Sequence, residues 1–400
     1  MIKRIASLYK DSFTGLSTDT WLLSLVVLIN RSGTMVVPYM TLYLTGKDMH
    51  HTLSEAGFVI SLFGLGSIFG AFIGGRLSDK IGFRKVQLLT LCLGGLTFML
   101  LGQIKSYPLI CVCTFVLSLL NEGFRPANSS AIAAYSKPEN RTRSFALNRL
   151  AINLGWSVGA SLGGLLAAWN YELIFWVDGG TNICAAILLY FFLKPQPVSL
   201  PVMESKVSAA PVLPAHKDKV FLCFIFLVTL FACCFFQLFT TVPKYFRDEM
   251  HLGERYIGLI MAVNGGLIVL FEMILIYSLE GKKQPLYYIR IGVIFCALAF
   301  FSLLIPGPAR WVALGMILLI TVGEMGSHPF LNSFWVPRAV EKNRGQYASY
   351  VTMAWGTAQT VGPYLSSRFA DVAGFTALFI SVGICFLLTA LGFLILGKYT

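Results

Sequence analysis

Seven ionisable side chains stand inside long apolar stretches of this sequence. A charged group in such a stretch is expensive to bury unless it is paired with another charge or reached by water. Each is therefore a candidate for carrying protons or for contacting a polar group of a bound solute, and we assign no catalytic residue. The candidates for substrate binding or proton coupling are Arg31, Glu122, Arg125, Glu272, Glu324 and His328, and the seventh residue is Asp178.

The spacing of Glu122 and Arg125 indicates an interaction. They are three residues apart, so on a helix they share one face and can form an ion pair. Because an arginine stays charged, Arg125 can tune the proton affinity of Glu122 or hold an anionic group. The alternative is a static ion pair that only holds the helix. Glu324 and His328 are one turn apart, and the alternative for His328 is a packing role.

Glu272 and Glu324 are the candidates for proton coupling. Glu272 lies in the apolar run 267–279, with no basic residue within one turn. An isolated carboxyl group there suits a carrier of protons or of cationic substrates, and we expect one of the two glutamates to be the coupling site. The alternative is a glutamate that is hydrogen-bonded to a neighbouring helix. Arg31 and Asp178 are expected to neutralise one another, although Arg31 stays among the cavity candidates.

The composition indicates which elements hold these residues. The chain has 400 residues, of which 56% are apolar and 12% are charged, and its mean hydropathy is +0.72. So few polar side chains cannot coat a water-soluble globule, and we expect the chain to lie in a bilayer. Lipid forces every backbone polar group to bond internally, and continuous apolar runs indicate helices rather than barrel strands. We predict an all-α polytopic membrane protein.

The apolar runs predict twelve transmembrane helices, each of about 20 residues or more. Residues 194–219 contain five prolines and six charged side chains and are typical of a linker. The predicted domains are an N-terminal six-helix bundle (1–193), a cytoplasmic linker (194–219) and a C-terminal six-helix bundle (220–400). The predicted spans are 20–44, 54–75, 86–104, 108–135, 145–169, 172–193, 220–243, 256–278, 286–305, 310–336, 346–367 and 374–397.

The distribution of lysine and arginine predicts the orientation, because cytoplasmic loops retain these residues. With both termini inside, 20 of the 31 lysines and arginines fall on the cytoplasmic side and seven fall outside. We therefore predict a multi-pass protein of the cell inner (cytoplasmic) membrane with both termini cytoplasmic. The net charge of +12 then reflects this bias and contact with anionic lipids rather than nucleic acid. The nine cysteines lie in apolar stretches and suggest neither disulfides nor a zinc site.

The two sets of predicted helices repeat one another. An offset of 203 residues superposes five separated positions, and an offset of 201 aligns Asp79 with Glu280. Parallel halves joined by a polar linker are typical of transporters that rock about a site near the bilayer midplane, so we predict two pseudo-symmetric bundles. The superposed pairs are Pro126 with Pro329, Ser130 with Ser333, Asn140 with Asn343, Arg141 with Arg344, and Gly159 with Gly362.

The loop after the second predicted span contains a motif that runs from Gly75 to Lys85 and reads GRLSDKIGFRK. Its glycines allow close helix approach and a tight turn, and its aspartate can cap a helix N-terminus and pair with basic residues. The loop resembles the signature loop of the major facilitator superfamily in sequence and in position, and the resemblance covers essentially the whole chain. It implies a conformational latch that breaks when the halves rock. The latch residues are Gly75, Asp79, Lys80, Gly82, Arg84 and Lys85.

The fifth predicted span is similar to the glycine-rich motif of the drug-proton antiporter branch of this superfamily, with Ala160 in place of its proline. Small residues at this spacing also let helices pack closely in lipid, which is the alternative explanation. Proton-coupled peptide carriers are less similar, because only Arg31 survives from their first-span motif. The helix-packing residues are Gly155, Gly159, Gly163 and Gly164.

These features predict a proton-coupled secondary active transporter that works by alternating access and exports lipophilic or cationic small molecules. The alternatives are a proton-coupled uptake symporter for a small polar solute such as a peptide, a lipid flippase on the same fold, and a membrane enzyme. The sequence shows no nucleotide-binding loop or metal-ligand cluster, so we expect no enzymatic activity and no cofactor. The expected partners are a small-molecule substrate, protons and membrane lipids, with the protein acting as a monomer.

Overall fold

The computed structural model describes residues 10–45, 49–51, 53–194 and 214–399. All regular secondary structure in these ranges is helical, which confirms the all-α prediction. Residues 195–213 of the predicted linker lie outside the described residues, as do Lys3, Arg4, Lys47 and Lys206, which entered the orientation count. The α-helices are α2 (Thr18–Ser32), α3 (Val36–Thr45), α4 (Leu53–Ile81), α5 (Phe83–Gln103), α6 (Tyr107–Tyr135), α7 (Arg141–Trp169), α8 (Tyr171–Phe192), α9 (Lys219–Phe235), α10 (Thr241–Asp248), α11 (Glu254–Leu279), α12 (Pro285–Ser302), α13 (Ala309–Trp335) and α14 (Arg344–Leu396).

Long apolar helices dominate the structure. In the described part of the chain, nine helical segments are long and apolar enough to cross a membrane. α2 and α3 are not among them, because they have 15 and 10 residues. α14 covers two of the predicted spans without a loop between them and kinks at Gly374, whose φ of +83° suits glycine. The count of twelve spans remains a prediction.

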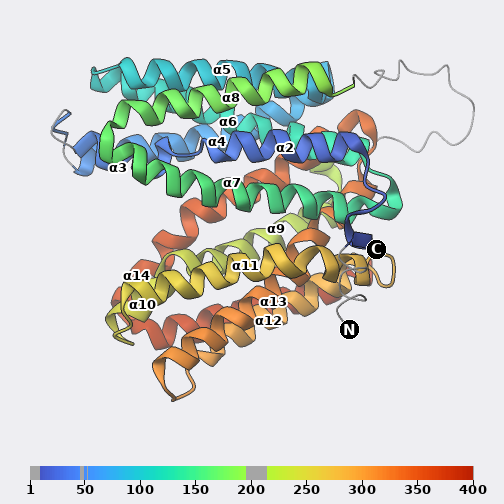
Figure 1. Cartoon of the computed structure of the whole chain (residues 1–400). Helices are drawn as coiled ribbons and strands as arrows, with labels where there is room; N and C mark the ends of the chain where they lie inside the picture. Colours follow the sequence, from blue (N-terminus) through green and yellow to red (C-terminus); the bar gives the residue numbers. More distant parts are fainter. Residues whose placement is uncertain (1–9, 46–48, 52, 195–213, 400) are drawn as a thin grey trace, which may run out of the picture.

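The helices form two groups that run side by side in similar directions (Figure 1). One group holds α2 to α8 and the other holds α9 to α14 (Figure 1). α14 packs against α9 and α12 and also reaches across to α4 and α6, while α7 contacts α11 and α13. The two groups therefore meet along two seams, one between α4 and α14 and the other between α7 and the pair α11 and α13.

The first predicted span is interrupted between α2 and α3. The carboxylate of Asp178 on α8 accepts hydrogen bonds from the backbone N–H groups of Met35 (3.0 Å) and Val36 (2.8 Å), at the start of α3. Gly33 packs so closely on Thr181 of α8 that a Cβ at this position would overlap it. Contacts with α8 therefore satisfy the free N–H groups that the interruption creates.

Two helix starts in different groups share the same local structure. α7 follows the 3₁₀ turn η1 (Pro138–Asn140), and α14 follows the 3₁₀ turn η5 (Glu341–Asn343). The residues before the helices have nearly equal backbone angles, with φ −120° and ψ 14° at Asn140 and φ −126° and ψ 11° at Asn343. These are two of the positions that the sequence offset of 203 superposes. The internal similarity thus extends to local geometry.

Asp218 fixes the start of α9. Its carboxylate accepts from the backbone N–H of Phe221 at 3.0 Å, from Nε and Nη2 of Arg338 at 3.0 and 2.9 Å, and from the hydroxyl of Tyr347 at 3.1 Å. Burial works to raise the pKa of Asp218, but the hydrogen bonds from Arg338 and Phe221 outweigh it and hold that pKa below its usual value. The ionised carboxylate ties the first turn of α9 to the end of α13 and the start of α14.

Candidate functional site

Arg149 joins the two groups of helices through buried ion pairs. Arg149 on α7 donates from Nη1 to Oε1 of Glu272 on α11 at 2.7 Å and from Nη2 to Oε1 of Glu324 on α13. The side chains of Glu272 and Glu324 are only 2% and 8% exposed, so little water screens these ion pairs. The guanidinium therefore cross-links α7 to two helices of the other group. We call these three residues the acidic cluster.

The acidic cluster carries one uncompensated negative charge when both carboxyl groups are ionised. The second oxygen of Glu324 accepts from Nδ2 of Asn264 at 3.2 Å, and this amide also donates to Oγ1 of Thr321 at 2.8 Å. In contrast, Oε2 of Glu272 is buried and has no hydrogen-bond partner among the described residues. A buried carboxylate oxygen without a donor is costly, and a proton on it removes both the charge and the need for a donor. Glu272 Oε2 is therefore the oxygen of the cluster at which a proton would be accommodated most easily.

A second charged cluster lies within the first group of helices. On α6, Nη1 of Arg125 donates to Oε2 of Glu122 at 2.9 Å, and the two side chains are 39% and 13% exposed. Arg31 on α2 is buried, and the charged groups that act on it are Glu122 and Arg125. This basic cluster, Arg31, Glu122 and Arg125, thus holds two positive charges and one negative charge.

The expected pairing of Arg31 with Asp178 is wrong. Both oxygens of Asp178 accept from the backbone N–H groups of Met35 and Val36, so the carboxylate acts as the cap of α3. The expectation assumed one unbroken helix over 20–44, whereas the interruption supplies N–H donors that compete for the carboxylate. Arg31 is left to interact with the residues of α6.

His328 packs among aromatic rings and does not bond the carboxylate of Glu324. Its Nδ1 lies 3.2 Å from the backbone oxygen of Glu324, and its ring centroid is 4.8 Å from that of Phe235 and 5.0 Å from that of Trp355. The ring of Phe236 lies 5.9 Å from that of Trp355. We call Phe235, Phe236 and Trp355 the aromatic wall; Phe235 and Trp355 contact His328, which lies one turn of α13 after Glu324.

The motif at the turn between α4 and α5 contacts the other group of helices. Oδ1 and Oδ2 of Asp79 accept from the backbone N–H groups of Gly345 (2.6 Å) and Gln346 (2.9 Å) in the first turn of α14. A carboxylate at this position satisfies free N–H groups and interacts favourably with the positive end of the helix dipole. The backbones of Gly75 and Gly345 approach so closely that a Cβ on either would overlap the other. We call this part of the molecule the α4–α5 end.

The remaining motif residues act within the first group. Gly82 adopts φ +88° before the first residue of α5, where a side chain would be strained. Nη2 of Arg84 donates to the backbone oxygen of Tyr190 near the end of α8 at 2.7 Å. Lys80 and Lys85 are exposed. These residues shape the turn and hold it against α8.

Glu280 repeats the arrangement of Asp79 on the other seam. Its Oε1 accepts from the backbone N–H groups of Thr142 (2.9 Å) and Arg143 (3.3 Å) in the first turn of α7. Its Oε2 also accepts from Nε of Arg143 at 2.9 Å. Thr142 and Arg143 are the residues that the offset of 203 superposes on the two partners of Asp79. Each group of helices thus caps one helix of the other group at the α4–α5 end.

The glycines of α7 bring it close to the first two helices. A Cβ at Gly155, Gly159 or Gly163 would lie within 2.6, 3.1 and 2.9 Å, respectively, of atoms in α2 or α3. Gly164 lies in the same helix. Small residues at this spacing allow close packing in lipid, so the geometry gives them a packing role.

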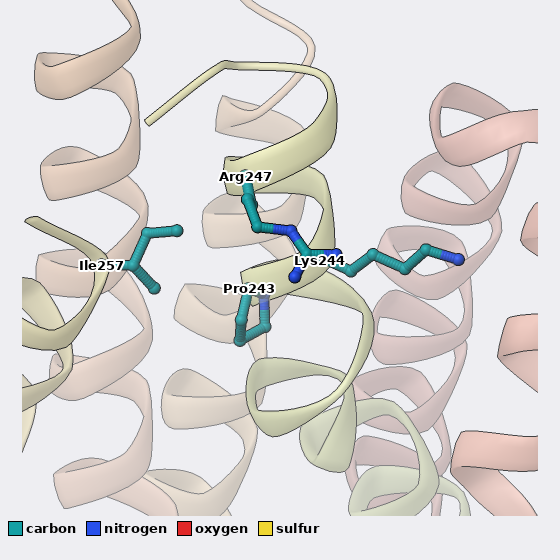
Figure 2. A pocket seen from close by; sticks show the side chains of 4 residues that line it. All are labelled: Pro243, Lys244, Arg247 and Ile257. Carbon is teal, nitrogen blue, oxygen red and sulfur yellow. The ribbon is translucent and has the colours of Figure 1, made fainter. Parts of the chain in front are cut away.

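A surface depression lies apart from both charged clusters. It has a volume of about 340 Å³ and is lined by Pro243, Lys244, Arg247 and Ile257 (Figure 2). Ile257 is near the start of α11, about four helical turns before Glu272. Among the described residues, no three His, Cys, Asp or Glu side chains gather closely enough to hold a metal ion. The two charged clusters and the aromatic wall are therefore the candidate site.

Sequence reasoning missed two residues of this arrangement. Arg149 is separated from Glu272 and Glu324 by 123 and 175 positions, so no local spacing relates them. One signal was available in the sequence. Glu272 and Glu324 lie in apolar runs without a lysine or arginine nearby, so a positively charged partner had to come from another helix. Glu280 was noted only as the counterpart of Asp79 at the offset of 201.

Comparison with known sequences places these observations in a family context. Residues 20–339 match the family model described as Major Facilitator Superfamily. The chain is 24% identical over 368 residues to the uncharacterized MFS-type transporter YttB of Bacillus subtilis (strain 168), covering 90% of each protein. It is 20% identical over 365 residues to the quinolone resistance protein NorA of Staphylococcus aureus, covering 88% of this chain and 89% of NorA.

Solved structures share the fold at low sequence identity. The outward-facing structure of a bacterial homologue of the iron transporter ferroportin superposes with a TM-score of 0.74 at 18% identity, covering 96% of this chain and 100% of that one. The proton:xylose symporter XylE superposes with a TM-score of 0.75 at 15% identity, covering 93% of this chain and 94% of that one. These likenesses confirm the fold.

Proposed function

The chain belongs to the major facilitator superfamily of multi-pass membrane transporters, and from this premise we propose that it is a proton-coupled secondary transporter that exports lipophilic or cationic small molecules. The observation that carries the proposal is the acidic cluster, in which one arginine of the first group of helices binds two buried glutamates of the other. A transporter that couples protons to movement needs a buried acid whose charge state controls a contact between moving parts.

The proposed architecture is twelve spans in two six-helix bundles, at 1–193 and 220–400, joined by the linker 194–219. The equivalent starts of α7 and α14 support it, as do the reciprocal caps formed by Asp79 and Glu280. Two bundles with parallel repeats can rock against each other around a site at their interface, which is alternating access. Both termini are then cytoplasmic, in the inner membrane.

In this mechanism the acidic cluster is the coupling site. With both glutamates ionised, Arg149 is attracted to Glu272 and Glu324 together and holds α7 against α11 and α13. Protonation of Glu272 at its unpartnered oxygen removes one of the two attractions and leaves a neutral acid beside an arginine that still has one counter-charge. The seam weakens and the bundles can separate there. Loss of the proton restores both attractions.

The contacts at the α4–α5 end form the proposed latch. Asp79 and Glu280 each cap a helix of the opposite group, and Thr142 Oγ1 lies 2.7 Å from Ser333 Oγ across the second seam. The proposed orientation places this end on the cytoplasmic side, so its closed contacts correspond to an outward-facing molecule. Opening toward the cytoplasm requires both caps to break.

The choice of export and of substrate rests on similarity and on one structural feature. NorA, named for quinolone resistance, aligns with almost the whole chain. The aromatic wall contacts His328, one turn after Glu324, and its partly exposed members Phe236 and Trp355 offer apolar surface to a lipophilic compound. A lipophilic cation could therefore place its apolar part against the aromatic wall and its positive group near Glu272 and Glu324.

The test is transport in proteoliposomes with an imposed pH gradient and ethidium as the transported dye. We expect proton-driven ethidium movement by the wild-type protein and its loss in either Glu272→Gln or Glu324→Gln. Glu172→Gln is the matched control, because Glu172 forms only an exposed pair with Lys105 at 3.5 Å. Wild-type pH dependence in both single variants would rule out the acidic cluster as the coupling site. Movement of a panel of peptides and sugars instead of dyes would favour uptake of a polar solute.

A further inference from the structure

The basic cluster has more positive charge than the protein neutralises. Arg125 pairs with Glu122 at 2.9 Å, and Glu122 is also the only acid among the charged groups that act on Arg31. Two guanidinium groups thus share one carboxylate in the interior of the first bundle. An unbalanced charge at such a depth is costly unless a counter-ion or water reaches it. The missing partner is a negative charge.

Arg31 is the group that most needs this partner. Its residue surface is only 7% exposed, and the nearby acid, Glu122, forms its ion pair with Arg125 and not with Arg31. The oxygens of Asp178 accept from the backbone of Met35 and Val36 instead. A guanidinium carries five N–H donors, and a mostly buried arginine is normally paired with an acid.

Arg125 supplies a route to this site from the interface between the bundles. The exposed apolar residues Leu109, Val112 and Val116 mark the lipid-facing side of α6. At 3.6 residues per turn, Arg125 lies roughly half a turn away from that side. Its 39% exposed side chain therefore lies on the side of α6 that faces away from lipid.

We propose that Arg31 and Arg125 form a subsite for a carboxylate group of a transported compound, so that the substrates include aromatic acids and zwitterions. The inference rests on the proposed transport function and narrows its substrate class. A planar carboxylate matches the fork of a guanidinium and can accept two hydrogen bonds from it. The acidic cluster and the aromatic wall, on the opposite bundle, are complementary to the positive group and the ring of such a compound.

Equilibrium binding to the purified full-length protein tests the subsite without any proton gradient. The probes are naphthoate, which has a ring and a carboxylate, and its methyl ester, which has the same ring without the charge. We expect the acid to bind the wild-type protein about tenfold more tightly than the ester, as for a charge-assisted hydrogen-bonded pair. Arg31→Gln and Arg125→Gln should each remove about tenfold of the acid affinity and leave ester binding unchanged.

Arg290→Gln is the matched control, because Arg290 lies on α12 beside Tyr287 and outside the basic cluster. Equal wild-type affinity for acid and ester would overturn the subsite, and so would unchanged acid binding in both variants.

If the variant Arg125→Gln does not fold, Arg125→Lys is measured in its place. Arg125→Lys keeps the positive charge and should retain part of the affinity for the acid. Chloride and acetate are included as competitors; if either alone displaces naphthoate fully at equal concentration, the site is for any small anion and the inference fails. Proton-driven ethidium transport without acid binding would leave the proposed function standing and remove only this inference.

Discussion

At the scale of single residues, the main feature of the structure is one arginine that forms ion pairs with two buried glutamates. Arg149 is the only described cation that bonds both Glu272 and Glu324, so removing it leaves two buried carboxylates together. Breaking a buried ion pair by deleting one partner typically costs about 3 kcal/mol or more, because an uncompensated charge remains. The arginine is therefore needed for the stability of the seam, independently of its proposed role in coupling.

This predicts a specific pattern of thermal stability. Arg149→Gln should lower the melting temperature of the purified protein by several degrees, whereas the triple variant with Glu272→Gln and Glu324→Gln should recover most of the loss. The recovery is expected because the triple variant has no charge left to compensate. Melting in detergent, followed by tryptophan fluorescence, measures it. An Arg149→Gln protein that melts like the wild type would contradict the role we assign to the ion pairs.

The residue types were easier to predict than their partners. A glutamate in an apolar run is conspicuous in sequence, so Glu272 and Glu324 were found without a structure. Their shared arginine was not found, because which helices are neighbours depends on the fold and not on local spacing. The same limit produced the wrong pairing of Arg31 with Asp178, whose real partners are backbone N–H groups exposed by an unpredicted interruption.

At the scale of secondary-structure elements, the sequence predicted where helices run better than where they bend. The starts and ends of α5, α6, α8 and α11 lie within a few residues of the predicted spans, because loops with charges and prolines mark them. The interruption between α2 and α3 was not predicted, because its polar residues 30–34 fall within one predicted span and the carboxylate that caps α3 lies on α8. The joined α14 was predicted as two spans, and Gly374 marks its kink.

The reciprocal caps at the α4–α5 end lead to a prediction about conformation. Replacing a helix-capping side chain by alanine typically costs about 1 kcal/mol, or roughly a fivefold change in an equilibrium. We therefore expect Asp79→Ala and Glu280→Ala each to shift the molecule toward opening at this end by about fivefold, with the double variant showing the product, because the caps lie on different seams.

The opening can be measured as the distance between spin labels at positions 85 and 283, both exposed lysines, after replacement of the exposed cysteines 92, 184 and 223. Asp371→Ala is the control, since Asp371 is exposed and lies in the distant kinked part of α14. Unchanged distance distributions in the double variant would show that the caps do not hold this end closed.

At the scale of the whole molecule, the internal repeat was readable from sequence, but the conformational state was not. The offset of 203 pairs Asn140 with Asn343, and the structure gives these residues equivalent places before α7 and α14. One sequence encodes every conformation of the protein, so only coordinates show that the α4–α5 end is closed. What distinguishes the states is which contacts between the bundles are made.

One of these contacts allows the rocking motion to be tested. Oγ1 of Thr142 on α7 and Oγ of Ser333 on α13 lie 2.7 Å apart, so the corresponding Cβ atoms are close enough for a disulfide to form with modest adjustment. The pair Thr142→Cys and Ser333→Cys should therefore cross-link the bundles under oxidation and cut proton-driven transport to about one tenth or less, since opening by even a few ångströms exceeds what a disulfide permits. Reduction should restore it.

The single variants serve as controls, because each keeps the local change without the cross-link. If a fully cross-linked protein transports at the wild-type rate, the seam between α7 and α13 does not separate at this end during the cycle. The cap that Glu280 forms on this seam is then a structural feature only. If transport stops on oxidation and returns on reduction, separation of α7 from α13 is a required step, and the ion pairs of Arg149 on the same seam must break in every cycle.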